Sequence, residues 1–172
     1  KMVVALDLGE WNDIHPLRKK PLGERFADAV TQEPAGPQIA KAKRKENKIE
    51  LEFNPEGGLL KIDKSAENEL QYFAIAGKDH KFVWAKASIE NNKVIVSSDE
   101  ISEPYFVRYA WADNPNVNFY NVEGLPASPF RTDGQNLDET KPWKGKKTAV
   151  VLTYDDALNV HLDNVIPALD SL

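Results

Sequence analysis

The sequence contains no cysteine among its 172 residues, so it forms neither disulfide bonds nor thiolate metal sites. No apolar run approaches the roughly 20 residues of a membrane-spanning helix, and no segment has the pattern of a signal peptide. None of the seven serines lies in a Gly-x-Ser-x-Gly turn, the strained strand-to-helix turn that presents a nucleophile in many hydrolases. The sequence therefore offers no recognisable serine nucleophile.

The sequence also lacks an excess of positive charge, since 27 acidic residues outnumber 22 Lys and Arg residues and the net charge is −5. This balance argues against nucleic acid as a partner. The one basic run, Lys41 to Lys45, is followed closely by Glu46 and Glu50, and we interpret it as a solvated linker rather than a phosphate-binding patch. A hydrophobic fraction of 41% and a charged fraction of 28% are typical of a globular protein.

The N-terminal quarter of the chain has an α/β pattern. Residues 2–8 form an apolar run that predicts a short buried strand, and a polar loop follows it through Pro16. Apolar residues then recur at helical spacing between Gly23 and Val30, which predicts an amphipathic helix. Since open α/β sheets carry their chemistry at the carboxyl ends of their strands, the polar loop is the first place to look for a site.

From Lys48 the period of the apolar residues changes from helical to strand-like. Strand patterns recur at short intervals with no helix between them, and Asn91-Asn92 is a hairpin signal because asparagine tolerates a positive φ. This order predicts an antiparallel β-sandwich, jelly-roll-like in type. Residues 113–133 are rich in Asn, Pro and Gly and are expected to wrap over another surface. The predicted strands cover residues 48–53, 59–62, 70–76, 82–89, 94–96 and 105–111.

The C-terminal segment starts a new pattern. Residues 134–147 read as a polar linker, a strand follows from Thr148 to Thr153, and a helical pattern then runs toward Leu172. This is the beginning of a second α/β unit. Because the chain opens with Lys1 in a strand-like run and ends within this helical pattern, we expect it to be an internal piece of a longer protein.

The candidate catalytic pair lies in the N-terminal loop, in Asp13-Ile-His-Pro16. A carboxylate two residues before a histidine can orient the imidazole and stabilise its charged form, as in a hydrolytic triad. The alternative interpretation of His15 is a loop histidine bonded to Asp13. Spacing alone favours the loop histidine, and the family resemblance of the surrounding residues, given below, favours the catalytic interpretation instead.

Residues 1–133 resemble the C-terminal part of the sialate O-acetylesterase family, carbohydrate acetyl esterases of the SGNH type. The motifs that carry the resemblance are Asp13-Ile-His-Pro16, Gly23-Glu-Arg25, Phe73-Ala-Ile-Ala-Gly77, Val107-Arg-Tyr-Ala-Trp-Ala-Asp-Asn-Pro115 and Gly124-Leu-Pro-Ala-Ser-Pro-Phe-Arg-Thr132. The resemblance implies a serine nucleophile far upstream, outside this chain, and a late catalytic histidine that matches His15. It implies an O-acetylated glycan as the substrate, no cofactor, and an extracytoplasmic location. The usual SGNH pattern is Asp-x-x-His, whereas here Asn12 stands three residues before His15 and Asp13 two.

Residues 148–172 are similar to the opening βα unit of a polysaccharide deacetylase, whose first motif is Thr-Phe-Asp-Asp-Gly and which here reads Thr153-Tyr-Asp-Asp-Ala157. The similarity implies that Asp155 is a general base and Asp156 a ligand of a divalent metal such as zinc. The histidine ligands of that family are absent from this segment, so the metal site would need a complete domain. Without the resemblance, the two aspartates read as the N-cap pair of a helix.

Together these patterns predict an esterase end at residues 1–47, a β-sandwich accessory domain at 48–133, a linker at 134–147 and a truncated deacetylase-like start at 148–172. The leading interpretation is a fragment of a carbohydrate O-acetylesterase with a Ser-His(-Asp) mechanism. The alternatives are one subunit of a split esterase and a non-catalytic carbohydrate-binding or structural module. In that module, aromatic residues at strand spacing would form either a sugar-stacking platform or part of the core. These aromatic residues are Trp84, Tyr105, Tyr109 and Trp111.

Overall fold

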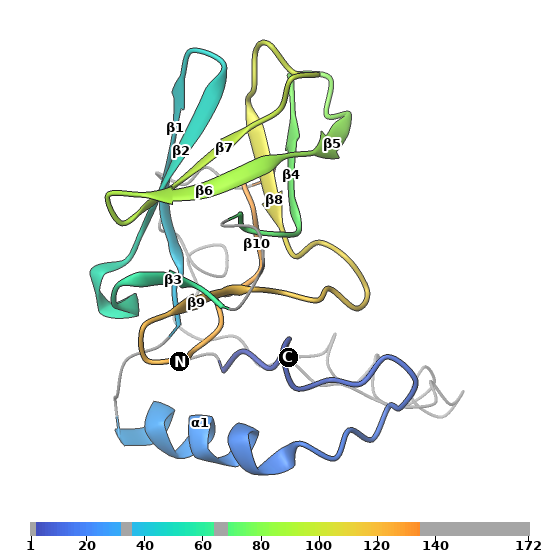
Figure 1. Ribbon diagram of the computed structural model, residues 1–172, viewed down its shortest axis with the longest axis vertical. Helices are drawn as coiled ribbons and strands as arrows, with labels where there is room; N and C mark the ends of the chain where they lie inside the picture. Colours follow the sequence, from blue (N-terminus) through green and yellow to red (C-terminus); the bar gives the residue numbers. More distant parts are fainter. Residues whose placement is uncertain (1–2, 32–35, 64–68, 135–172) are drawn as a thin grey trace, which may run out of the picture. The chain divides into compact units, whose positions relative to one another are not determined.

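The computed structural model describes residues 3–31, 36–63 and 69–134, and this part of the chain is mainly β with one α-helix (Figure 1). All pairings between its strands are antiparallel, which confirms the predicted mainly-β, antiparallel fold class. No helix in these ranges is long and apolar enough to cross a membrane. The elements are α1 (Lys19–Thr31), β1 (Ile39–Lys45), β2 (Lys48–Phe53), the 3-10 turn η1 (Pro55–Gly57), β3 (Leu60–Ile62), β4 (Phe73–Ala76), β5 (Phe82–Trp84), β6 (Lys86–Glu90), β7 (Lys93–Ser97), β8 (Phe106–Tyr109), β9 (Phe119–Asn121) and β10 (Phe130–Arg131).

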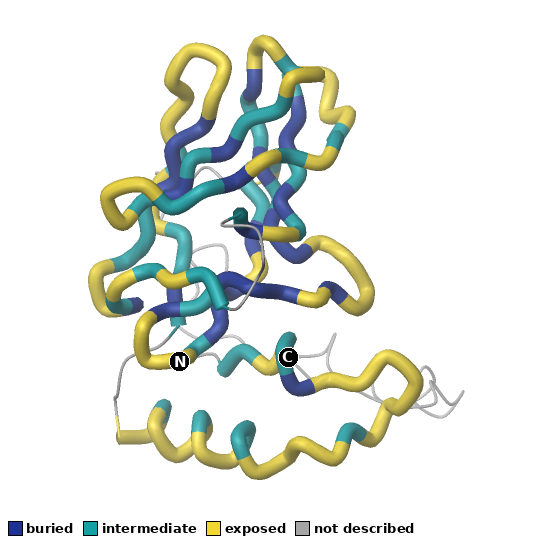
Figure 2. The backbone as a smooth tube through the Cα atoms, in the orientation of Figure 1, coloured by how far each residue is buried: buried dark blue, intermediate teal, exposed yellow. Residues whose placement is uncertain are grey.

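The strands form two four-stranded sheets, with the orders β1-β2-β7-β6 and β10-β8-β4-β5, and a two-stranded sheet of β3 and β9. Alternate residues of each larger sheet point inward, because successive side chains of a strand face opposite ways. The inward side chains of both sheets join in one apolar core. Figure 2 shows the buried stretches of the backbone in dark blue. The members of the core include Ile49, Leu51, Phe73, Ile75, Val94, Val96, Val107, Tyr109, Phe119 and Phe130.

The hairpin between β6 and β7 forms as the sequence predicts. Asn91 and Asn92 both adopt a positive φ, 49° and 59°, and Glu90 pairs with Lys93 on either side of them. Two left-handed residues give the turn a twist that matches that of the flanking strands. The turn fixes the register that places Val94 and Val96 in the core.

The strand predicted at residues 2–8 is wrong for its described part, because residues 3–8 form turns and irregular backbone. Leu8 is buried as expected, but none of residues 3–8 belongs to a strand of the described sheets. Two of the backbone carbonyls in this segment, those of Val4 and Asp7, instead accept hydrogen bonds from arginine side chains. An apolar run predicts burial, but a strand also needs an edge with which to pair.

The linker interpretation of residues 41–45 is wrong, because these residues belong to β1. This strand pairs with β2 from Ile39 opposite Phe53 to Lys45 opposite Lys48, with a shift of register between Ile39 and Lys41. The sheet therefore begins before residue 47, where we placed the end of the esterase segment. Five of the seven side chains of β1 are exposed, so the strand lacks the alternation by which a half-buried strand is recognised.

The segment predicted as one strand at residues 82–89 divides at Ala85 into β5 and β6, which belong to different sheets. The wrapping segment at 113–133 likewise supplies two short strands, β9 and β10. Two asparagines fix the course of this segment. Asn118 bonds the backbone of Glu69 and Gln71, and the buried Asn121 donates to the carbonyl of Gly57.

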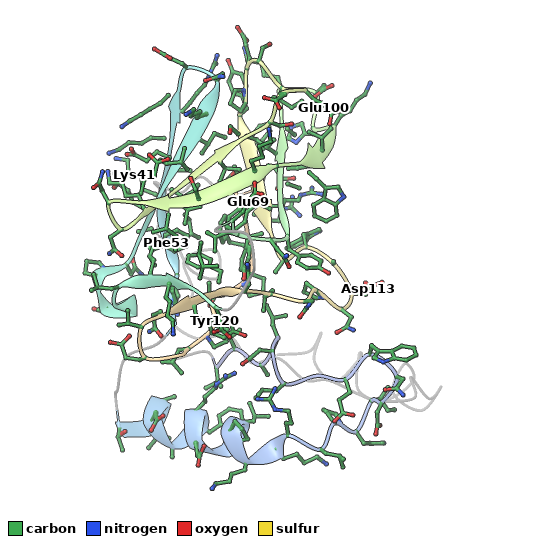
Figure 3. All side chains as sticks on the ribbon, in the orientation of Figure 1. Lys41, Phe53, Glu69, Glu100, Asp113 and Tyr120 are labelled. Carbon is green, nitrogen blue, oxygen red and sulfur yellow. The ribbon has the colours of Figure 1, made fainter. Side chains whose placement is uncertain are left out.

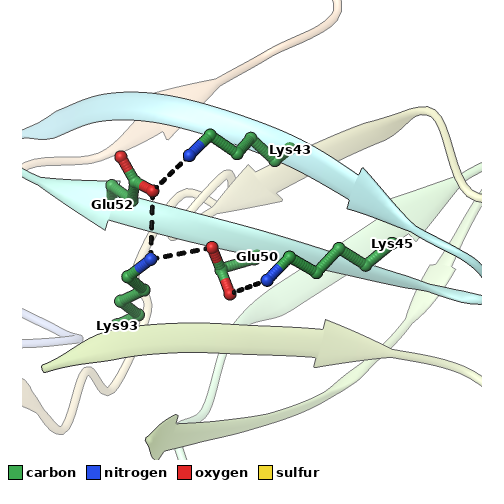
Figure 4. A network of polar contacts seen from close by, with 5 residues as sticks. All are labelled: Lys43, Lys45, Glu50, Glu52 and Lys93. Atoms are coloured by element: carbon green, nitrogen blue, oxygen red, sulfur yellow. Dashed lines mark hydrogen bonds and ion pairs between the residues drawn. The ribbon is translucent and has the colours of Figure 1, made fainter. Parts of the chain in front are cut away.

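A network of charged side chains covers the outer face of β1, β2 and β7 (Figure 4). Lys93 lies between two glutamates, 2.9 Å from Glu50 and 3.1 Å from Glu52. Each glutamate also pairs with a lysine of β1 at 2.7 Å, Glu50 with Lys45 and Glu52 with Lys43. The hydrogen bonds from Lys43 and Lys93 lower the pKa of Glu52 from 4.5 to about 2.

This network predicts a loss of stability in acid. A carboxylate whose pKa is lowered on folding stabilises the protein fully above its unfolded pKa of 4.5, and this contribution disappears as the pH falls toward about 2. The melting temperature should therefore fall through this window, and Glu52→Gln should flatten the fall. The size of the effect should shrink in high salt, because the side chains are partly exposed.

The matched control is Glu56→Gln, which replaces an exposed glutamate that forms no ion pair with any described residue. This variant should keep the acid dependence of the original chain. Parallel pH profiles for Glu52→Gln and the original chain would show that the network contributes nothing to stability.

Candidate functional site

The loop that carries the predicted catalytic pair is closed by hydrogen bonds from its own backbone to two carboxylates. Asp13 Oδ1 accepts the backbone N–H of His15 at 2.7 Å, and Glu10 Oε1 accepts the backbone N–H of Leu17 at 2.9 Å. Aspartate commonly bonds the backbone two residues further on, which stabilises a turn. The carboxylate of Asp13 thus fixes the backbone of His15 and leaves the imidazole exposed.

The base of this loop is anchored by an arginine of α1. Arg25 makes two parallel 2.7 Å hydrogen bonds to the carboxylate of Asp7, and its Nη1 also donates to the carbonyl of Val4 at 2.8 Å. The two paired side chains are only 12% and 14% exposed. The hydrogen bond to Asp7 raises the pKa of Arg25 against the opposing effect of burial. A bidentate pair of this kind is stronger and more specific in its geometry than a single contact.

A polar hollow of about 660 Å³ lies between the N-terminal segment and the β-sheet part of the molecule. Asp7, Glu10, Asn12 and Arg18 line it from one side, and Tyr120 of β9 lines it from the other. Burial, and after it the nearby carboxylate of Asp7, raises the pKa of Tyr120. His15 does not line this hollow, although it follows Asn12 by only three residues. The hollow therefore borders the loop without containing the imidazole.

Several large apolar side chains of the loop and of α1 are exposed. Trp11, Ile14 and Leu17 of the loop are all exposed, as are Phe26 and Val30 of the helix. No residue of α1 is buried, and Figure 2 shows this helix exposed over most of its surface. Contiguous exposed apolar patches mark interaction sites, and three such side chains within one short loop make this loop a candidate for one.

The structure places His15 and Asp13 in one turn, two residues apart. The contact it records between them runs from the carboxylate to the backbone, and the role of Asp13 toward the imidazole stays a prediction. Asp155 and Asp156 lie outside the described residues. Within the described ranges, no three side chains of the metal-binding types lie close enough together to hold an ion.

The four aromatic residues considered as a stacking platform have different surroundings. Tyr109 is fully buried in the core, and burial raises its pKa. Tyr105 is half-buried, with the cations of Arg44 and Lys78 over its ring. The two tryptophans, Trp84 and Trp111, are instead exposed on the surface.

Sequence reasoning missed the anchoring pair of Asp7 and Arg25. The helical pattern places Arg25 on the polar stripe of α1, where a charged side chain is expected to face water. One signal was present, since Arg25 ends the motif Gly23-Glu-Arg25 that contributes to the family resemblance. A contact across eighteen residues of sequence has no local periodicity that would reveal it.

No protein-family model matches the chain, and neither does any curated protein. Among solved structures, it is similar to a carbohydrate acetylesterase from Xanthomonas citri, with 35% sequence identity and a TM-score of 0.67. The match covers 75% of this chain and 31% of that protein, so the chain spans about a third of the length of its relative. The chain is therefore related in sequence and fold to a carbohydrate esterase.

Proposed function

We propose that this chain is part of a carbohydrate O-acetylesterase of the SGNH type, with a serine nucleophile that lies outside it. The observation that carries the proposal is the 35% identity to a carbohydrate acetylesterase over three quarters of the chain. The substrates we propose are the O-acetyl groups of sialic acid or of related acetylated sugars. The loop of Asp13 and His15 would supply the base.

In this mechanism the neutral imidazole of His15 removes the proton of the serine hydroxyl as its oxygen attacks the ester carbonyl. The resulting imidazolium then protonates the sugar oxygen, so the C–O bond of the ester breaks and an acetyl-enzyme remains. Water, deprotonated by the same imidazole, hydrolyses the acetyl-enzyme and releases acetate. Asp13 would stabilise the imidazolium as well as hold the turn.

Two features support a missing catalytic portion. The side chains of Trp11, Ile14 and Leu17 beside the proposed base are exposed, although apolar groups of this size gain about 1.5–3 kcal/mol each from full burial. The same holds for Phe26 and Val30 on α1. An esterase segment that brings the serine to His15 would lie against this part of the surface and cover these side chains.

We also propose, from the resemblance of residues 148–172, that a deacetylase-like unit follows the sandwich. Asp155 would act there as a general base and Asp156 as a ligand of a divalent metal, which would polarise the scissile carbonyl. One carboxylate ligand does not complete a metal site, so this unit would act only with ligands from elsewhere in the intact protein.

The proposal is tested by comparing the isolated chain with the product from its natural source. The isolated chain should not hydrolyse an aryl acetate, since a base without its nucleophile has nothing to activate. The natural product, detected with an antibody against this chain, should be several times larger and should react with a fluorophosphonate probe for activated serines. A separate serine-containing chain recovered with it would favour the split esterase. Rapid hydrolysis by the isolated chain that disappears in His15→Ala would contradict the proposal.

A further inference from the structure

The outer face of the sheet that contains β4, β5 and β8 carries two exposed tryptophans around a hollow. Trp84 is 68% exposed and Trp111 is 54% exposed, and both line a hollow of about 280 Å³. Trp84 and Tyr72 also line an adjoining hollow of about 450 Å³. The indole of Trp84 therefore stands between two depressions of the surface. We call this surface the tryptophan groove.

The register of the strands explains the hollow between the tryptophans. Ala74 of β4 pairs with Trp84 of β5 on one side and with Arg108 of β8 on the other. These three residues form one row across the outer face, since the neighbours of Ala74, Phe73 and Ile75, point into the core. The methyl group of Ala74 is the smallest side chain in this row, and it leaves the space that the larger side chains border.

The aromatic side chains are held in place although they are exposed. The ring of Tyr72 meets that of Trp84 edge to face at 6.1 Å between centroids. The guanidinium groups of Arg108 and Arg131 lie 5.7 Å and 5.4 Å from the ring of Trp111, and both pair with the buried carboxylate of Asp133. Groups that are fixed before binding lose little conformational freedom when a ligand arrives.

The backbone under the groove is strained at two points. Tyr72 and Ala110 both have a positive φ, 61° and 52°, a backbone conformation that residues other than glycine seldom adopt. The backbone N–H of Ala110 donates to the carbonyl of Tyr72 at 2.9 Å, which ties the two residues together. Tyr72 belongs to the groove, and Ala110 precedes Trp111. Strain of this kind clusters at binding and catalytic sites.

Arg108 lines the narrower hollow and is paired with Asp133, so the unbalanced charge of the groove lies around the wider hollow. The wider hollow is lined by three carboxylates, those of Glu69, Asp99 and Glu100, against one lysine, Lys86, which pairs with Asp99 at 2.9 Å. Figure 3 labels two of these acidic residues, Glu69 and Glu100. The carboxylate excess repels anions. The same carboxylates are good acceptors for neutral hydroxyl donors.

A neutral oligosaccharide has the complementary chemistry. The C–H bonds of a pyranose ring form an apolar face that stacks on an indole, and its hydroxyl groups project from the ring edge toward charged hydrogen-bonding partners. We propose that the tryptophan groove binds a neutral glycan chain, with one sugar ring on either side of Trp84. The site contains no residue of the N-terminal loop, so it holds a glycan without taking part in ester cleavage.

The proposal is tested with the full chain by calorimetric titration of unacetylated neutral hexasaccharides of glucose, xylose and mannose. At least one should bind, and Trp84→Ala or Trp111→Ala should weaken its binding by about tenfold or more. Ala74→Leu, which fills the hollow and keeps both tryptophans, should weaken it similarly. Near-ultraviolet circular dichroism and thermal melting establish that each variant is folded. A hexamer of galacturonic acid should bind much more weakly.

The matched control is Trp11→Ala, which removes an exposed indole from the N-terminal loop. This variant should bind as the original chain does. Equal loss of affinity in Trp11→Ala, full affinity in both groove variants, or no binding of any neutral hexasaccharide would overturn the proposal. Because these ligands carry no ester, each of those results would leave the proposed esterase mechanism standing.

Discussion

Replacing His15 by alanine in the intact esterase is expected to lower kcat/KM for an O-acetylated sugar by at least about 1,000-fold. The imidazole is the only proposed acceptor of the serine proton and the only proposed donor to the leaving sugar oxygen. Its loss therefore removes the catalyst from both halves of the reaction. The measurement is acetate release by the natural, serine-containing product and by its His15→Ala variant, with KM and kcat determined separately.

His80→Ala provides a matched control, because His80 is also exposed but stacks on Phe106 in a strand turn far along the chain from His15. This variant should retain the activity of the original protein. Asp13→Ala should have a smaller effect than His15→Ala, with part of the loss arising from the turn that Asp13 stabilises. Activity within a few-fold of the original in His15→Ala would remove this histidine from the proposed mechanism.

Phe119→Ala is expected to lower the free energy of unfolding by about 3–5 kcal/mol. Its ring is fully buried, and it meets the rings of Phe53, Tyr109 and Phe73 at centroid distances of 5.1, 5.6 and 6.2 Å. Truncation loses the free energy of transferring the ring from water to the core. It also leaves a cavity in which the neighbouring side chains lose their packing contacts. Since whole domains are stable by only about 5–15 kcal/mol, urea unfolding should detect a large shift of the midpoint.

The control for this prediction is Phe26→Ala, because Phe26 is half-exposed on α1. Its removal should change the free energy of unfolding by less than about 0.5 kcal/mol in the isolated chain. A change of under 1 kcal/mol for Phe119→Ala would mean that β9 does not contribute to the core, and that it lies loosely over the sheets.

The strands that could be predicted from the sequence are those in which apolar and polar side chains alternate. In β2, the inward Ile49 and Leu51 bracket the outward Glu50, and this period of two identifies the strand without any structure. The hairpin of β6 and β7 was also predictable, because Asn91-Asn92 marks the turn between the two strands. β1 was missed because Lys43, Arg44 and Lys45 are all exposed, so its pairing with β2 leaves no trace in the hydrophobic pattern.

The site was predictable to the extent that its chemistry is local in sequence. Asp13 and His15 are two residues apart, and the turn that joins them follows from the aspartate itself. The anchor between Asp7 and Arg25 was not predictable, because a helical pattern tells which residues share a face but not which segment that face meets. The tryptophan groove depends on Ala74 lying opposite Trp84, a register that only the paired strands reveal.

The charged strand β1, at one edge of the β1-β2-β7-β6 sheet, affects whether copies of this protein can associate through their sheets. Among the described strands, β1 is an outermost one of its sheet, and an edge strand of this kind can template a strand of another copy. A second copy would have to displace or bury the charged side chains of this strand together with their partner carboxylates, and this cost opposes such an encounter. The run of charges at 41–45 thus acts as a gatekeeper that keeps neighbouring copies from extending the sheet into an aggregate.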